Sequence, residues 1–242
     1  MQLTARLAQG RLHYAWVIAA VTFLTLLTAA GTRATPGVLI VPLEQAFGWS
    51  RATISAAVSV NLVLYGLMGP FAAALLDRLG VRATMLISLA LVAVGVALTS
   101  LMTAAWQLVL LWGVVVGSGT GMTALALGAT VVNRWFSERR GLVMGVLTAS
   151  TATGQLLFLP LMAWAVETYG WRPAVLAVAA AGLLVMPLIA LCMRDRPADV
   201  GLAPYGEKGP AVAVPRSTAN PAAAALSALA RDVRSRASGC WR

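Results

Sequence analysis

The uncharged run from residue 83 to residue 133 constrains this chain more than any other feature. It holds 51 residues without a single Asp, Glu, Lys or Arg. As one helix it would measure about 75 Å, more than twice the ~30 Å hydrocarbon core of a bilayer. The run must therefore fold back on itself. We expect the turn at residues 101–107, where Thr, Trp and Gln interrupt the apolar sequence.

Four further segments are equally free of charge, namely residues 14–32, 52–76, 141–166 and 173–193. Backbone polar groups in lipid must be bonded within the chain, so these segments are predicted to be helices. The fold class is an all-α membrane protein with six transmembrane helices in a domain spanning residues 14–196. Residues 1–13 precede this domain, and residues 197–242 follow it as a linker and tail.

The basic residues predict the orientation of the chain. If both termini lie on one side, 15 of the 18 Lys and Arg residues fall on that side, and only Arg33, Arg51 and Arg172 fall elsewhere. Lys and Arg accumulate in cytoplasmic segments. We therefore expect an integral protein of the cytoplasmic (inner) membrane with both termini in the cytoplasm. The net charge of +10 needs no nucleic-acid partner, because no soluble domain or binding motif presents the basic residues.

The sequence does not suggest an enzyme. Cys192 and Cys240 have neither disulfide nor metal-ligand spacing. The chain shows no nucleophile–base pair, no cluster of metal-ligating residues and no phosphate-binding glycine loop. We expect no cofactor and no metal.

Two arginine-rich turns stand between apolar runs. The first follows Gly69 and reads Asp77-Arg-Leu-Gly80-Val-Arg82. Gly80 suits a tight reversal with positive φ, and Asp77 is placed to bond free backbone N–H groups at a helix start. The second is Asn133-Arg-Trp-Phe-Ser-Glu-Arg-Arg140, followed by a glycine-containing helix. On local physics alone, the first turn is a well-capped loop at a membrane surface.

The first turn resembles the signature loop of the major facilitator superfamily. The second turn, together with Glu44–Ala52 and Arg194–Leu202, is similar to the monocarboxylate-transporter-like and oxalate/formate-antiporter-like branches. The resemblance covers residues 10–208 and corresponds to the N-terminal half of such a carrier, built as two inverted three-helix repeats. It implies secondary transport of a small organic anion, such as a monocarboxylate or dicarboxylate. It also implies conformational roles for Gly69, Asp77, Arg78, Gly80, Arg82, Arg134, Arg139 and Arg140.

The chain departs from the family pattern at two places. Val81 stands where the signature loop usually carries a basic residue, and the Gly-Pro dipeptide of the antiporter motif is absent, since Gly154 and Pro160 are separated. Exchange as a mechanism is therefore not supported by that motif.

Arg33 is the one charge inside an apolar run, where a charge costs at least ~2.5 kcal/mol and usually faces a cavity or a partner. It shares one helix face with several threonines. Asn61 and Tyr65 lie one turn apart in the second helix, as do Thr151 and Gln155 in the fifth. We predict a substrate cavity that includes Arg33, Asn61, Tyr65 and Gln155. In the alternative interpretation, each Thr bonds its own helix and Arg33 extends toward the outer interface.

Glycines recur every four residues at Gly113, Gly117 and Gly121, and again at Gly141 and Gly145. This spacing is typical of closely packed membrane helices.

The tail changes composition after residue 197. Residues 203–221 are typical of a flexible linker, and 222–236 of a short basic surface helix. Residues 238–242 match what a single-base deletion would give in the family's helix-seven sequence, so we hypothesise a frameshift there. The competing hypotheses are a carrier truncated to its first half, a non-transporting fragment, and a half-carrier that pairs with a partner half or a second copy.

Overall fold

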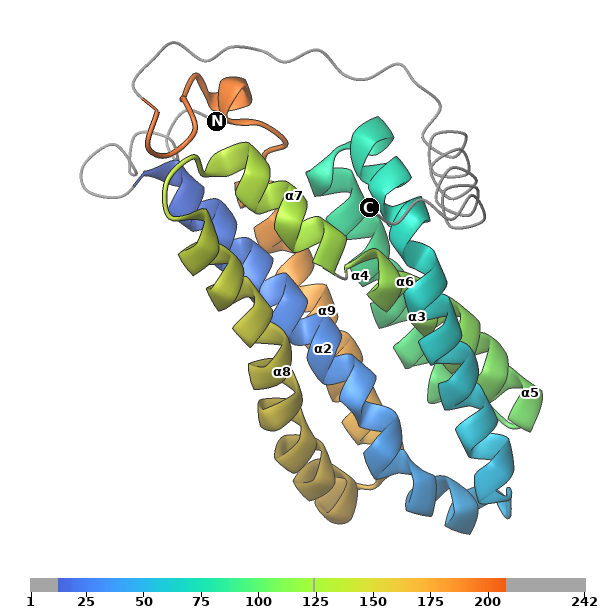
Figure 1. Cartoon of the computed structure of the whole chain (residues 1–242). Coiled ribbons are helices and arrows are strands. Elements are labelled where there is room, and N and C mark those ends of the chain that lie inside the picture. The colour runs from blue at the N-terminus through green and yellow to red at the C-terminus, as the bar shows by residue number, and fades with distance from the viewer. Residues whose placement is uncertain (1–12, 124, 208–242) are drawn as a thin grey trace, which may run out of the picture.

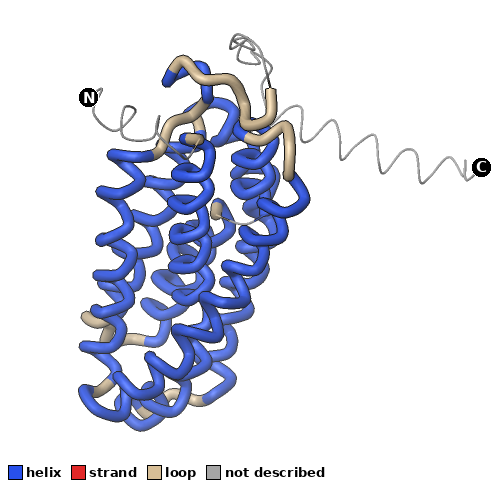
Figure 2. The backbone as a smooth tube through the Cα atoms, turned by 90° about the vertical axis from the view of Figure 1, so that its left-hand side faces the viewer, coloured by secondary structure: helices blue, strands red, loops and turns tan. Residues whose placement is uncertain are grey.

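The computed structural model describes residues 13–123 and 125–207. Six helices are long and apolar enough to cross a membrane, and the described residues form no strand. They run side by side in one elongated bundle (Figures 1 and 2). This confirms the predicted all-α fold with six spans.

The first three spans are single helices: α2 (Tyr14–Phe47), α3 (Arg51–Leu79) and α4 (Val81–Thr99). The His13 ring accepts the Ala15 N–H at the start of α2, and α2 ends where Gly48 adopts φ 68°. The Ser50 hydroxyl accepts the Thr53 N–H at the start of α3. These caps satisfy backbone groups that a helix end leaves unpaired.

The fourth span, Ala105–Trp135, is interrupted. It consists of α5 (Ala105–Leu108), a π-helical segment η1 (Val109–Val116), α6 (Gly117–Met122) and α7 (Leu125–Trp135). The turn before it falls at Ser100–Ala104, so it overlaps the predicted 101–107 turn, and residues 105–107 belong instead to α5. The sequence did not predict the π-helical segment.

The last two spans are α8 (Arg140–Tyr169) and α9 (Trp171–Cys192), followed by a single 3₁₀ turn, η2 (Pro197–Val200). Gly80 joins α3 to α4 and Gly170 joins α8 to α9 with nearly the same backbone, φ 87° and ψ 171° against φ 85° and ψ 169°. Each glycine is followed by one residue and then an arginine, Arg82 or Arg172. This match agrees with two repeats of three helices.

The bundle has two chemically different ends. The arginine-rich end comprises the Gly80 turn, residues 136–139 and the segment after Met193. The tryptophan-rich end comprises the turns next to Trp49, Trp106 and Trp171. A buried apolar cluster fills each end: one contains Ile18, Trp135 and Phe136, and the other contains Leu39, Ile54 and Trp112.

The segment after α9 differs from the flexible linker predicted from residue 203. Tyr205 pairs with Phe136 in an isolated parallel bridge, and Leu202 and Tyr205 pack on the apolar cluster of the arginine-rich end. Apolar side chains at these positions explain why this part of the linker is docked. The remainder of the predicted linker, the basic helix 222–236 and the frameshift site at 238–242 lie outside the described residues.

Candidate functional site

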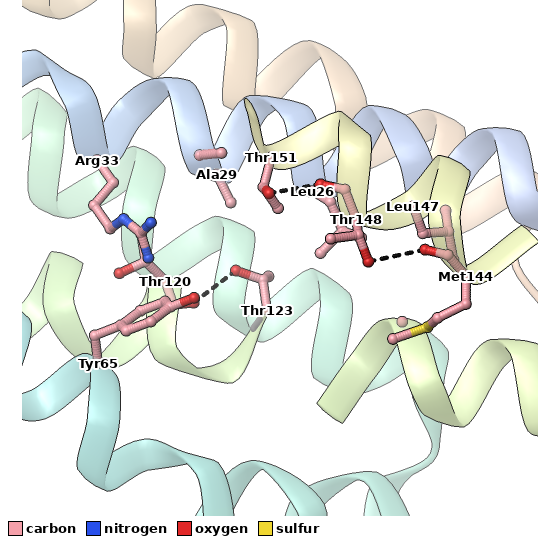
Figure 3. Close-up of a pocket in the computed structure, with 12 residues that line it drawn as sticks. Leu26, Ala29, Arg33, Tyr65, Thr120, Thr123, Met144, Leu147, Thr148 and Thr151 are labelled. Carbon is pink, nitrogen blue, oxygen red and sulfur yellow. Dashed lines mark hydrogen bonds between the residues drawn. The ribbon is translucent and has the colours of Figure 1, made fainter. Parts of the chain in front are cut away.

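A cavity of about 270 Å³ lies in the middle of the bundle (Figure 3). Its wall comes from α2, α3, α6, α7 and α8, that is, from both repeats. The twelve lining residues are Leu26, Ala29, Ala30, Arg33, Tyr65, Thr120, Thr123, Gly128, Met144, Leu147, Thr148 and Thr151. Aliphatic side chains of α2 and α8 share this wall with the hydroxyl groups of Tyr65 and of four threonines.

Arg33 is the only charged residue in this wall. It lies on α2 nineteen residues after Tyr14 and fourteen before Phe47, near the middle of the helix. Its guanidinium carbon sits 4.2 Å from the centre of the Tyr65 ring, and both side chains are half-buried. A cation over an aromatic face gains about 0.5–2 kcal/mol, which offsets part of the cost of placing a charge there.

No carboxylate among the described residues forms a salt bridge with Arg33. Glu44, the nearest acidic residue in sequence, instead pairs with Arg51 at 2.8 Å. The Arg33 side chain lies instead over the Tyr65 ring in the cavity wall. Arg33 carries five N–H donors on the wall of a cavity that holds no opposite charge.

The threonines of α2 do not form a polar cavity wall. Thr22, Thr25, Thr28, Thr32 and Thr35 are buried, and each hydroxyl donates to the carbonyl four residues earlier. None of them lines the cavity. The threonine hydroxyls that do line it belong to Thr120, Thr123, Thr148 and Thr151. Three of them, on Thr123, Thr148 and Thr151, also donate to backbone oxygens of residues in the same wall (Figure 3).

The structure brings together only two of the four predicted substrate residues. Arg33 and Tyr65 meet in the cavity, whereas Asn61 and Gln155 do not line it. The Asn61 amide is buried and donates to the Trp112 carbonyl at 2.8 Å. That carbonyl belongs to the π-helical segment, which sequence periodicity did not reveal. Gln155 is half-buried on α8.

The predicted conformational residues gather at the arginine-rich end, apart from Gly69, which lies about three turns before the end of α3. The Arg140 Nε donates to the Phe136 carbonyl at 2.6 Å, and Arg139 adopts φ 58° just before α8. Arg134 and Asp77 form an ion pair at 3.6 Å. Gly69 has open space where a Cβ would lie.

Asp77 does not cap a helix start, contrary to the expectation from its sequence position. It lies in the last turn of α3, where it faces Arg134. The backbone N–H of Arg82 instead donates to Asp195 at 2.9 Å. The capping carboxylate thus comes from 113 residues further along the chain, a distance that local sequence patterns cannot bridge.

Six membrane-length spans around a central cavity, with one half-buried cation in its wall, are the arrangement of a membrane transport protein. The model of the Major Facilitator Superfamily matches residues 21–238. The chain belongs to this superfamily, in its monocarboxylate-transporter-like branch.

Two relatives illustrate the branch. Rat monocarboxylate transporter 13 is 30% identical over 170 residues, which are 70% of this chain and 40% of the relative. Mouse monocarboxylate transporter 9 is 29% identical over 195 residues, or 81% of this chain and 38% of the relative. The chain therefore spans about two-fifths of the length of the curated relatives that it matches.

Solved structures agree on the fold. The proton:xylose symporter XylE bound to 6-bromo-6-deoxy-D-glucose superposes with a TM-score of 0.65 at 18% identity, over 76% of this chain and 46% of the symporter. A peptide transporter in complex with alafosfalin superposes with a TM-score of 0.64 at 16% identity, over 94% of this chain and 46% of the transporter. At these identities the likeness concerns the fold alone.

Proposed function

We propose that this chain supplies the substrate-binding N-terminal half of a secondary transporter for a small organic anion. The observation that carries the proposal is Arg33, a cation near the middle of a transmembrane helix that lines the central cavity. It contacts the Tyr65 ring and has no acidic partner in the described chain. A carboxylate from the substrate would supply the missing countercharge, in the bidentate geometry that guanidinium favours.

The single charge favours a monocarboxylate over a dicarboxylate. A second carboxylate would face the aliphatic part of the wall, around Leu26, Ala29 and Leu147, where burying an unpaired charge is costly. The short aliphatic tail of a monocarboxylate fits that surface. The names of the relatives, monocarboxylate transporters 9 and 13, point to the same class.

We further infer the orientation and the partner. The arginine-rich end faces the cytoplasm, with both termini there, in the inner membrane. In carriers of this fold the substrate binds between two halves that rock around it. A second half, or a second copy of this chain, would provide the opposite wall. The competing possibility is a polypeptide that binds an anion without transporting it.

Equilibrium binding tests the proposal on the 242-residue chain in nanodiscs, with radiolabelled propionate as the monocarboxylate and succinate as the dicarboxylate. Propionate should bind in a saturable way. Arg33→Ala should weaken this binding about tenfold or more, as expected when a charge-assisted contact of ~1.5–3 kcal/mol is lost. Succinate should bind more weakly than propionate.

Thr25→Ala is the matched control. Thr25 lies two turns before Arg33 on α2, is fully buried, and donates only to its own helix. Its replacement should leave propionate binding unchanged. Equal affinity of Arg33→Ala and the parent would refute the assigned role of Arg33. Tighter binding of succinate would overturn the monocarboxylate assignment alone.

A further inference from the structure

The segment Met193–Glu207, hereafter the strap, crosses the arginine-rich end of the bundle (Figure 1, orange). It leaves α9 with Met193 buried and passes through η2, where Pro197 is also buried. It then runs to the turn between α7 and α8. The strap therefore touches elements of both three-helix repeats.

Its first anchor joins α9 to α4 through two opposite contacts. The Asp195 carboxylate accepts the backbone N–H of Arg82 in the first turn of α4, at 2.9 Å. The Arg82 guanidinium donates to the carbonyl of Ala190 in the last turn of α9, at 2.6 Å. An anion thus meets a helix N-terminus and a cation meets a helix C-terminus, which is the favourable arrangement for both helix dipoles.

Gly80 allows the Asp195 carboxylate to approach the start of α4. A Cβ at this position would lie 2.5 Å from Asp195 Oδ1, closer than atoms can pack. The residue also caps α4 without any side chain of its own. Any other residue type at position 80 would push Asp195 away from the helix start.

The second anchor lies at the other end of the strap. The Tyr205 N–H donates to the Trp135 carbonyl at 2.8 Å, and the Tyr205 carbonyl accepts the N–H groups of Ser137 and Glu138 at 2.9 and 3.1 Å. The Ser137 hydroxyl donates to Glu207 at 2.6 Å. The Tyr205 ring lies edge-on to Trp16 of α2, with centroids 5.9 Å apart.

Among the described residues, no such anchor occurs at the repeat-related turn of the tryptophan-rich end. Gly170 has almost the same dihedral angles as Gly80. Yet nothing lies within 4 Å of the position its Cβ would take. Arg172, the counterpart of Arg82, lies beside its neighbour Trp171, at 5.2 Å from the ring centroid. Among the described residues, hydrogen bonds therefore join α4 to α9 and the strap at the arginine-rich end alone.

We propose that the strap locks the arginine-rich ends of the two three-helix repeats into one rigid unit, with Asp195 as the positioning residue. The two anchors act together, because only seven residues, which contain a 3₁₀ turn, connect Asp195 to residues 203–205. The tryptophan-rich end keeps the freedom to change its packing. Relative movement of α4 and α9 then pivots about the arginine-rich end.

Hydrogen exchange on the full chain in nanodiscs tests the proposal through Asp195→Asn. The neutral amide accepts the Arg82 N–H more weakly than a carboxylate does. Exchange at Arg82 should accelerate about tenfold. Because the strap acts as one unit, exchange at Ser137 and Glu138 should accelerate as well, about threefold or more. The control Glu167→Gln removes an exposed carboxylate at the other end of the bundle and should change neither region.

A purely local cap would accelerate only Arg82, and unchanged exchange at Ser137 and Glu138 in Asp195→Asn would overturn the proposal. A pair of glycine variants provides a second test. Gly80→Ala and Gly170→Ala impose the same backbone strain, but only Gly80→Ala displaces Asp195. Gly80→Ala should accelerate exchange at Ser137 and Glu138, and Gly170→Ala should not. That difference should vanish in the Asp195→Asn background, and its persistence there would also contradict the proposal.

Discussion

At the scale of single residues, His13 links the start of α2 to the strap. Its Nδ1 accepts the Ala15 N–H at 3.3 Å, its ring lies 5.5 Å from that of Tyr205, and it hydrogen-bonds the backbone of Ala203. Burial lowers the pKa of His13, and the Ala203 bond opposes this shift only in part. Protonation would also remove the Nδ1 acceptor, so the neutral ring is the form that the fold requires.

We therefore predict that His13 titrates below its ordinary pKa of about 6.5. The unfolded chain binds the proton more readily, so this contribution to stability is full above about pH 6.5 and is lost as the pH falls through the lower folded value. His13 is the only histidine in the chain, so its ring signals in an NMR titration are unambiguous. A midpoint at or above the ordinary value would contradict the prediction.

Single residues also show how far sequence reasoning reaches. The place of Arg33 and Tyr65 beside a cavity was predictable, because a charge in an apolar run usually faces a cavity and Tyr65 lies on a polar face of the second helix. The position of Asn61 outside the cavity was not predictable, since its amide donates to a carbonyl of a π-helical segment 51 residues away. The threonines of α2 satisfy their own hydroxyls within the helix, so their alignment on one face carried no information about the cavity.

At the scale of helices, close packing is confirmed for the glycines of the fourth span but not for those of α8. A Cβ on Gly121 would lie 2.6 Å from the Met68 side chain of α3, and one on Gly117 would lie 3.0 Å from the Asn61 backbone. Gly141 and Gly145 on α8 have nothing within 4 Å. The four-residue spacing is the same, so spacing alone could not separate the two groups.

We predict opposite effects of alanine at these two kinds of position. Gly121→Ala should lower the thermal unfolding midpoint in detergent, because overpacking costs about 1–3 kcal/mol. Gly145→Ala should leave it unchanged or raise it, because alanine gains up to ~1 kcal/mol over glycine in a helix. Differential scanning fluorimetry of both variants checks this. An equal loss of stability would show that Gly145 is packed in the folded protein.

The number, type and approximate limits of the helices followed from charge and length alone. Membrane helices can be predicted in this way, because lipid excludes charge and the bilayer thickness sets the length of each span. Phe47-Gly48-Trp49 resembles Tyr169-Gly170-Trp171 in sequence, but Gly48 has ψ 17° and Gly170 has ψ 169°. Gly170 corresponds to Gly80, because their backbone dihedral angles are nearly the same. Similarity of the neighbouring residues alone would have paired Gly170 with Gly48.

At the scale of the whole molecule, the proposed orientation makes a prediction that labelling can check. Leu79→Cys lies exposed at the arginine-rich end and Ala46→Cys lies exposed at the tryptophan-rich end. In a background without Cys192 and Cys240, a membrane-impermeant maleimide should label position 46 in intact cells. Position 79 should react only after the membrane is permeabilised. Strong labelling of position 79 in intact cells would reverse the orientation.

The central claim is that this chain forms one wall of an anion pathway, which binds substrate but needs a second half to release it on the other side. The most direct test measures equilibrium binding and time-resolved flux of labelled propionate in the same proteoliposomes of the 242-residue polypeptide. We expect binding that depends on Arg33 and no saturable flux. Saturable, substrate-specific flux would contradict the account, and would show that the six-helix unit completes the pathway by assembling with itself.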